Sequence, residues 1–91
     1  MKVVPMLNEV GNVVKNQYTY YFEGCYILQS YDRWTVKIEG DGQIYLDEKS
    51  WDASKTTAKY RNQFLNMGTN EIHEKIKTGE IKVINLNGDS S

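Results

Sequence analysis

The stretch WTVKIEGDGQIYLD, residues 34–47, determines the fold class of this chain. Trp34, Val36 and Ile38 alternate with polar residues, and this period of two is typical of a strand with one buried face. Gly40-Asp41-Gly42 follows as a turn in which the glycines accept positive φ values at little cost. A second alternating run then ends at Asp47. The pattern predicts an antiparallel hairpin in which Tyr45 faces away from the buried side.

Two runs rich in aromatic and β-branched residues precede this hairpin, at residues 18–22 and 25–31. Glu23-Gly24 between them suits a two-residue turn, so the sequence predicts a meander of four strands from about Tyr18 to Asp47. Residues 3–14 are expected to add a ragged strand. Pro5 cannot donate a backbone hydrogen bond, so that strand belongs at an edge of the sheet.

From Trp51 onward the pattern changes to that of helices. A hydroxyl of Ser54, Thr56 or Thr57 is expected to cap a helix that runs to Met67, with Gly68 as its stop. A second helix is expected over residues 71–78, capped by Thr69 or Asn70 and ended by Gly79, and residues 80–86 resemble a last strand. The predicted fold is therefore α+β, an antiparallel β-meander of four to five strands with two short helices packed on one face.

Composition narrows the possible functions. Ninety-one residues make a single small domain, residues 1–91, whose polar end at residues 87–91 is expected to fray. Eleven basic and twelve acidic residues give a net charge of -1, which argues against a dedicated duplex-DNA binder. Cys25 is the single cysteine, so no internal disulfide can form. No apolar run is long enough to span a membrane and no signal peptide is recognisable, so a cytoplasmic protein without a membrane partner is expected.

The tyrosines are the most unusual feature of the sequence. Tyr18, Tyr20, Tyr21, Tyr26, Tyr31 and Tyr45 lie on expected strands, and alternation cannot bury all of them. If Trp34, Val36 and Ile38 face the helices, Tyr45 faces outward, and either Tyr20 or Tyr21 joins it. An outer face with several tyrosines suits a protein interface or stacked single-stranded nucleic acid, and it also occurs in small sheets with no such role.

Charged residues form two blocks of opposite sign. Residues 39–52 hold five acidic residues and one basic residue, and Asp41, Asp47 and Glu48 are the candidates for an acidic rim beside the tyrosines. Lys55, Lys59 and Arg61 follow without an acidic residue until Glu71, so the start of the first helix is a candidate anion or nucleic-acid site. The alternative for both blocks is a solvated surface and an ordinary helix cap.

Catalytic and metal motifs are missing from the sequence. No phosphate loop, dinucleotide fingerprint, nucleophile elbow or zinc spacing occurs, and His73 is the only histidine available to a catalytic thiol at Cys25. We therefore expect no metal, no cofactor and no enzymatic activity.

Three short motifs carry a resemblance to a family. Gln29-Ser30-Tyr31-Asp32, the stretch from Trp51 to Leu65 (WDASKTTAKYRNQFL), and Ile76-Lys77 with Gly79 resemble small uncharacterised proteins of phages and prophages of Gram-positive bacteria. The resemblance spans about residues 18–86, although Arg33-Trp34 stand where that family has small and β-branched residues. It brings no catalytic residues.

The resemblance implies an accessory protein that binds and modulates or inhibits a host protein, such as a nuclease or a component of anti-phage defence. Tyr21 and Tyr45 with the acidic rim are the expected partner-binding residues. A nucleic-acid-binding module that uses Lys55, Lys59 and Arg61, and a small homodimer, are the alternatives.

Overall fold

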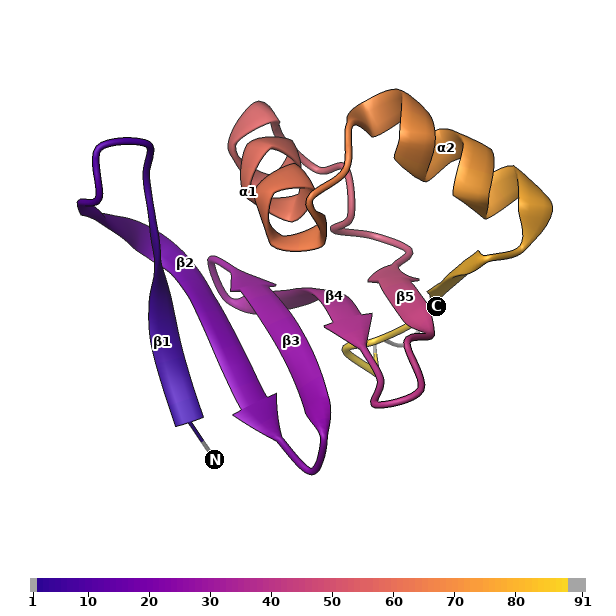
Figure 1. The fold of residues 1–91 in the computed structure, drawn as a ribbon, viewed down its shortest axis with the longest axis horizontal. Coiled ribbons are helices and arrows are strands. Elements are labelled where there is room, and N and C mark those ends of the chain that lie inside the picture. Colours follow the sequence, from indigo (N-terminus) through magenta and orange to yellow (C-terminus); the bar gives the residue numbers. More distant parts are fainter. Residues whose placement is uncertain (1, 89–91) are drawn as a thin grey trace.

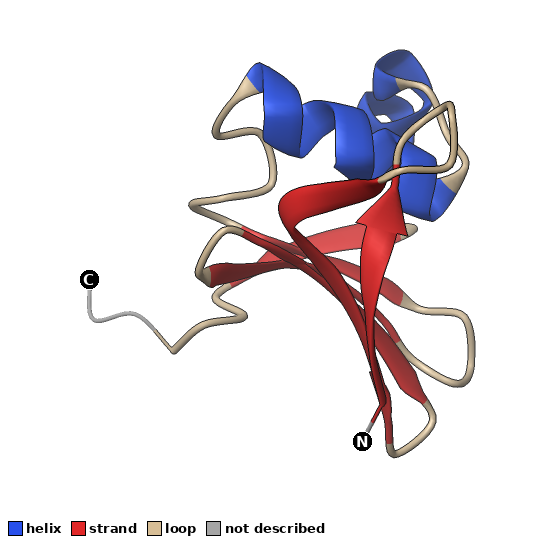
Figure 2. Ribbon diagram, turned by 90° about the vertical axis from the view of Figure 1, so that its left-hand side faces the viewer, coloured by secondary structure: helices blue, strands red, loops and turns tan. Residues whose placement is uncertain are grey.

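The computed structural model describes residues 2–88 and has two layers, a six-stranded sheet and a pair of helices on one of its faces (Figures 1 and 2). The strands are β1 (Lys2–Leu7), β2 (Val13–Phe22), β3 (Cys25–Ser30), β4 (Arg33–Ile38), β5 (Ile44–Asp47) and β6 (Ile81–Ile84). The helices are α1 (Lys55–Leu65) and α2 (Thr69–Thr78). The α+β class is confirmed, whereas the expected four to five strands are six.

The strands lie in the order β1-β2-β3-β4-β5-β6, so each is a neighbour of the next. β1 to β5 form an antiparallel meander, and its strands β2 to β5 are the four that the sequence predicted. β6 runs parallel to β5 because α1 and α2 carry the chain back across the sheet before it pairs again. The sheet is therefore mixed and not wholly antiparallel.

The turn between β2 and β3 has the expected two residues. Glu23 and Gly24 have φ values of 52° and 78°, so both adopt the left-handed conformation that suits a tight hairpin. The far end of β3 differs slightly from prediction. Tyr31, with a φ of 60°, already belongs to the next turn, and the strand ends at Ser30.

An irregularity in β4 changes the orientation of a tryptophan. Leu28 pairs with Val36, but the next residue of β3, Gln29, pairs with Trp34, so Thr35 is an extra residue on β4. A bulge of this kind shifts the alternation of side chains along the strand. Val36 faces the helices as expected, and Trp34 lies on the other face, which corrects the predicted orientation.

The helix boundaries follow local capping chemistry. The Ser54 hydroxyl oxygen accepts the backbone N–H of Thr57 and so caps α1. The helix ends at Leu65 because Asn66 takes the left-handed conformation with a φ of 55°, two residues before the predicted stop at Gly68. α2 begins directly after Gly68, without a side-chain cap, and ends at Gly79 as predicted.

The hydrophobic core lies between the helices and the sheet. It combines apolar residues from β1, β3, β4, β5 and β6 with residues of both helices. The buried members are Met6, Leu28, Val36, Leu46, Tyr60, Leu65, Ile72 and Ile81. Phe64 and Met67 pack against it from the α1 side.

β1 is an edge strand, as Pro5 predicted. Val3 and Val4 on this strand are 49% and 45% exposed, which is high for apolar side chains within a sheet. The connection to β2 rests against α1, where the Gln63 side-chain amide donates to the backbone oxygen of Leu7 at 2.8 Å. β1 is thus fixed at its far end and open along its outer edge.

The chain after β6 is anchored at its first polar residues. The Asn87 side chain accepts from the backbone N–H of Trp34 and donates to the backbone oxygen of the same residue, both at 2.9 Å. The expectation of a frayed tail is therefore wrong at Asn87. The rest of that expectation concerns residues 89–91, which lie outside the described residues.

A buried amide under α1 leads to a stability prediction. Gln17 has no exposed surface, and within residues 2–88 neither polar atom of its side chain has a hydrogen-bond partner. An unpaired buried polar group costs about 1–3 kcal/mol. We expect Gln17→Met to raise the free energy of unfolding by about 1–2 kcal/mol in urea denaturation.

The control for this prediction is Gln29→Met. The Gln29 amide donates to the backbone oxygen of Tyr31 at 2.9 Å, so its replacement gains nothing. A loss of stability in Gln17→Met would contradict the prediction and would indicate an ordered water bound to this amide.

Candidate functional site

One face of the sheet carries no helix. Leu28, Val36 and Leu46 pair across β3, β4 and β5 and belong to the core beneath the helices. Successive strand residues point to opposite faces, so the neighbouring row lies on the other side. We call that side the helix-free face. Its residues include Tyr18, Tyr20 and Phe22 on β2, Ile27 on β3, Trp34 and Lys37 on β4, Tyr45 on β5 and Lys82 on β6.

Two aromatic side chains contact each other across the centre of the helix-free face. The rings of Phe22 on β2 and Trp34 on β4 lie 6.3 Å apart, although β3 separates their strands. Between them, Ile27 on β3 is completely buried and yet is not part of the core under the helices. The aromatic residues therefore form a small apolar cluster of their own on this face.

Tyr45 lies on the helix-free face, as predicted. It pairs with Lys37 on one side and Lys82 on the other, so a half-buried tyrosine stands between two lysines. Lys37 has Glu39 at 3.9 Å, whereas Lys82 has no ion pair within residues 2–88. Tyr20 joins the same row because it pairs with Ile27. The centre of the face is thus aromatic, with cationic groups towards β6.

Tyr21, the other tyrosine predicted for the partner surface, lies on the opposite face. It pairs with Tyr26, and their ring centroids are 4.8 Å apart. Both tyrosines belong to the helix side of the sheet, because Tyr26 and Leu28 point the same way along β3. Tyr21 and Tyr45 therefore cannot contribute to one continuous surface, which corrects that expectation.

Asp47 is not part of an exposed acidic rim. Its side chain has no exposed surface, and its Oδ2 accepts from the Ser50 hydroxyl at 2.8 Å and from Arg33 Nη2 at 3.1 Å. Its Oδ1 accepts from the backbone N–H of Leu86 at 3.0 Å. Asp47 is therefore a structural junction between β5, β4 and the segment after β6.

The electrostatics of Asp47 agree with this structural role. Burial by itself raises the pKa of the carboxyl group. The hydrogen bonds from Ser50, Arg33, Asn87 and Leu86 outweigh that effect and lower the pKa from 3.8 to about 2. The carboxylate is therefore charged at neutral pH and fully occupied within the fold.

The two other acidic candidates are exposed but play no part in the aromatic cluster. Asp41 lies in the turn between β4 and β5, where its Oδ1 accepts from the backbone N–H of Gln43 at 2.9 Å. Glu48 directly follows β5. The predicted rim is thereby reduced to Asp41 and Glu48, at two separate points along the chain.

The cationic candidates on α1 are largely neutralised by acidic residues from elsewhere in the chain. Arg61 is completely buried, and its Nη1 lies 3.1 Å from Asp52 and 2.9 Å from the backbone oxygen of Trp51. Lys59 lies 3.4 Å from Glu9 in the loop between β1 and β2. Lys55 alone of the three is exposed and without such a partner within residues 2–88. The expected cluster of three free cations is therefore not formed.

Phe22 and Trp34 are the surface residues that sequence reasoning missed. A signal existed for Phe22, because it alternates with Tyr21 and so shares a face with Tyr20. Trp34 carried no such signal, since the bulge at Thr35 cannot be read from its neighbours. The orientation of the side chains on β4 can therefore be determined only from the strand pairing in the folded sheet.

The described residues contain neither a candidate metal-binding cluster nor a candidate membrane-spanning helix. Between Lys2 and Gly88 no group of three or more histidine, cysteine, aspartate or glutamate side chains is placed to hold a metal ion. None of the helices in this part of the chain is both long enough and apolar enough to cross a membrane.

The fold and this surface define a small α+β protein with a mixed sheet and an open aromatic face. Residues 1–81 match a family described as a family of unknown function (DUF8033), and the chain belongs to that family. No curated protein and no solved structure matches the chain.

Proposed function

We propose that this chain is a non-enzymatic binding protein that docks another protein on its helix-free face. One observation carries the proposal, the placement of Tyr20, Phe22, Trp34 and Tyr45 on a sheet face that no helix covers. The resemblance to phage accessory proteins extends the proposal to the partner. It favours a host protein, such as a nuclease or an anti-phage defence component, whose activity this chain modulates or inhibits.

The composition of the face supports a protein partner. An antiparallel sheet with one solvated side usually presents polar residues there, but this face presents tyrosine, tryptophan and phenylalanine. Tyrosine and tryptophan supply large contact areas at low entropic cost and are common energetic centres of interfaces. Ile27 and the rings around it already pack together, so little rearrangement is needed when a partner binds.

The geometry weakens the alternative of a nucleic-acid site on α1. Arg61 is buried and Lys59 faces Glu9, which leaves Lys55 as the free cation of that group within residues 2–88. Single-strand binding depends on a groove with several available cations beside the stacking rings. A protein partner is therefore the better explanation, and an oligonucleotide belongs in the test as a competitor.

The test is capture from a Gram-positive bacterial lysate with the tag at the C-terminus. We expect Tyr20→Ala combined with Tyr45→Ala to lower recovery of the captured protein at least tenfold, since central interface tyrosines contribute about 1–2 kcal/mol each. Tyr21→Ala combined with Tyr26→Ala is the matched control, because it removes two tyrosines from the opposite face. It should leave recovery unchanged.

Two results would overturn the proposal. Equal recovery with the wild type and the Tyr20/Tyr45 variant, both shown to be folded by circular dichroism, would exclude the helix-free face. Tight binding of a labelled single-stranded oligonucleotide that weakens steeply with salt would replace a protein partner with nucleic acid.

A further inference from the structure

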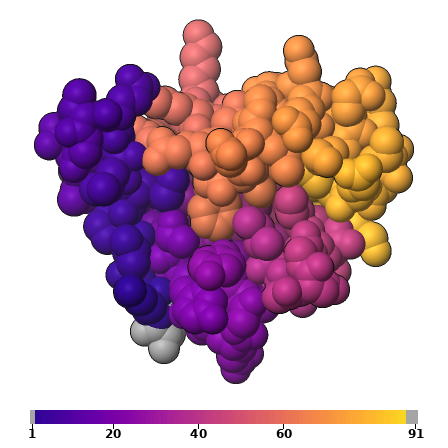
Figure 3. Space-filling model, in the orientation of Figure 1, coloured from indigo at the N-terminus to yellow at the C-terminus, as the bar shows by residue number. Residues whose placement is uncertain are grey.

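The ends of β1, β2 and β3 extend beyond the helices. Figures 1 and 2 show α1 and α2 over one part of the sheet, while the turn between β2 and β3 projects away from them. In the space-filling view the purple atoms of this end form the lower tip of the molecule, below the orange helices (Figure 3). The helix side of the sheet is therefore uncovered here, and Tyr21 and Tyr26 are 45% and 48% exposed.

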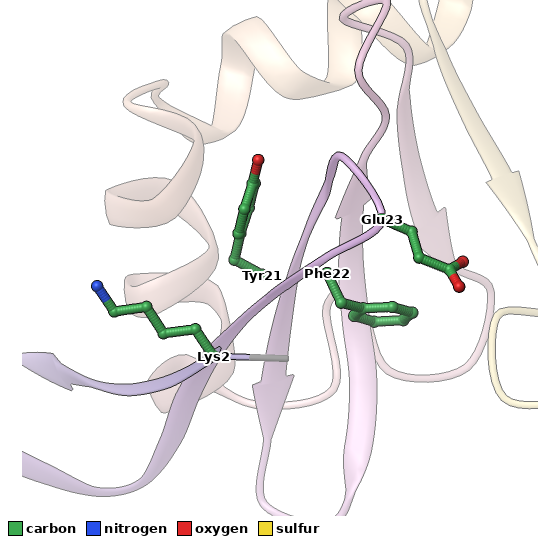
Figure 4. Close-up of a pocket in the computed structure, with 4 residues that line it drawn as sticks. All are labelled: Lys2, Tyr21, Phe22 and Glu23. Atoms are coloured by element: carbon green, nitrogen blue, oxygen red, sulfur yellow. The ribbon is translucent and has the colours of Figure 1, made fainter.

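A hollow at this end is lined by Lys2, Tyr21, Phe22 and Glu23 (Figure 4). Lys2 on β1 pairs with Tyr21, and Glu23 begins the turn after β2. In the close-up the ammonium group of Lys2 and the carboxylate of Glu23 point to opposite sides of the aromatic residues. Within residues 2–88 neither side chain has an ion pair or hydrogen bond, so both charges are available to a partner.

We infer that this end is the contact of a homodimer, formed with a second copy of the chain. A two-fold symmetric interface must be complementary to itself. A patch with a cation on one side of its aromatic centre and an anion on the other meets that condition. A two-fold axis between the two copies places Lys2 opposite Glu23 of the partner subunit. The same axis places Glu23 opposite Lys2 of the partner subunit.

The aromatic centre supplies the apolar part of this contact. The rings of Tyr21 and Tyr26 already contact each other, with centroids 4.8 Å apart and planes tilted by 45°, so little rearrangement is needed on association. Val4, 45% exposed on the helix side of β1, extends the apolar surface next to them. The area of this contact is small, so we expect a weak dimer that forms only at high concentration. Its expected dissociation constant is roughly 10 µM to 1 mM. The two tyrosines of this contact lie on the other side of the sheet from Tyr45, and only Phe22 belongs to both surfaces, so either proposal can fail without the other.

Charge exchange between the two sites tests the dimer. Sedimentation velocity over that concentration range should show association of the wild type, with a C-terminal tag to leave Lys2 undisturbed. Lys2→Glu alone and Glu23→Lys alone each place like charges opposite one another and should weaken association at least tenfold. The double variant reverses both charges and should restore it. Both side chains are exposed, so all variants are expected to fold.

The matched control is Lys55→Glu, an equal charge change on exposed surface at the start of α1. It should leave association unchanged. A wild type that remains monomeric up to about 1 mM would overturn the inference. A double variant as weak as the single variants would also overturn it, because the two charges would then not face each other.

Discussion

Asp47→Ala is expected to lower the free energy of unfolding by about 3–4 kcal/mol. The carboxylate is fully buried and is the shared acceptor for the Ser50 hydroxyl, Arg33 and three backbone N–H groups, those of Lys49, Ser50 and Leu86. Alanine removes this shared acceptor, and with it the hydrogen bond that connects Leu86, after β6, to the end of β5. Urea denaturation of both proteins at pH 7 gives the difference.

The pH dependence of stability provides a second readout. The pKa of Asp47 is about 2 in the folded chain and 3.8 when unperturbed, so the unfolded state binds the proton more readily. The contribution of this group, about 2 kcal/mol, is fully present above the unfolded pKa and is lost as the pH falls through the folded pKa. The wild type should therefore lose this stability between about pH 5 and pH 2, and Asp47→Ala should lack that part of the decline.

Glu48→Ala is the matched control for Asp47, because it removes the adjacent carboxylate, which is exposed. It should change the free energy of unfolding by less than about 0.5 kcal/mol. Equal stability of the Asp47 and Glu48 variants would show that the buried junction contributes nothing to the fold.

Arg61→Ala is expected to lower the free energy of unfolding by about 3 kcal/mol, or to reduce the melting temperature by roughly 15 °C. The guanidinium group donates to the backbone oxygen of Trp51, to Asp52 and to Asn62, and lies 5.2 Å from the centre of the Trp51 ring. It also reaches the Thr69 hydroxyl at 3.3 Å and so connects α1 to the first residue of α2. Its loss removes several buried hydrogen bonds together.

Arg61→Lys separates charge from geometry. Lysine keeps the positive charge but cannot reproduce the planar fork that serves several acceptors, so a loss of about 2 kcal/mol is expected. Lys59→Ala is the control, since the ion pair of Lys59 with Glu9 is exposed and contributes little. Thermal denaturation followed by circular dichroism distinguishes the three variants. Full stability of Arg61→Lys would show that charge alone matters here.

The central meander could be predicted because its signals are local. Alternation along residues 34–38 and the Glu23-Gly24 turn depend only on neighbouring residues. The bulge at Thr35 and the parallel pairing of β6 could not be predicted, because they depend on register and on a crossover through both helices. One extra residue was sufficient to move Trp34 to the other face.

The candidate site also contains residues that could be predicted from local patterns and residues that could not. Tyr45 was placed correctly because the alternation in β5 is clear, whereas Tyr20 and Tyr21 are both aromatic and either could face outward. Asp47 looked like an exposed strand end. Its backbone donor at Leu86 is 39 residues away in the sequence, and no local pattern indicates that contact. A distant partner of this kind explains why the burial of Asp47 could not be predicted.

Pro5 has a consequence for how this chain behaves at high concentration. β1 presents an open edge with exposed valines, an arrangement that in other sheets templates the addition of further strands. Proline has no amide hydrogen, so a continuous ladder cannot extend past the middle of this edge. Copies of the chain can therefore associate without forming fibrils, and at high concentration the protein should remain in discrete particles.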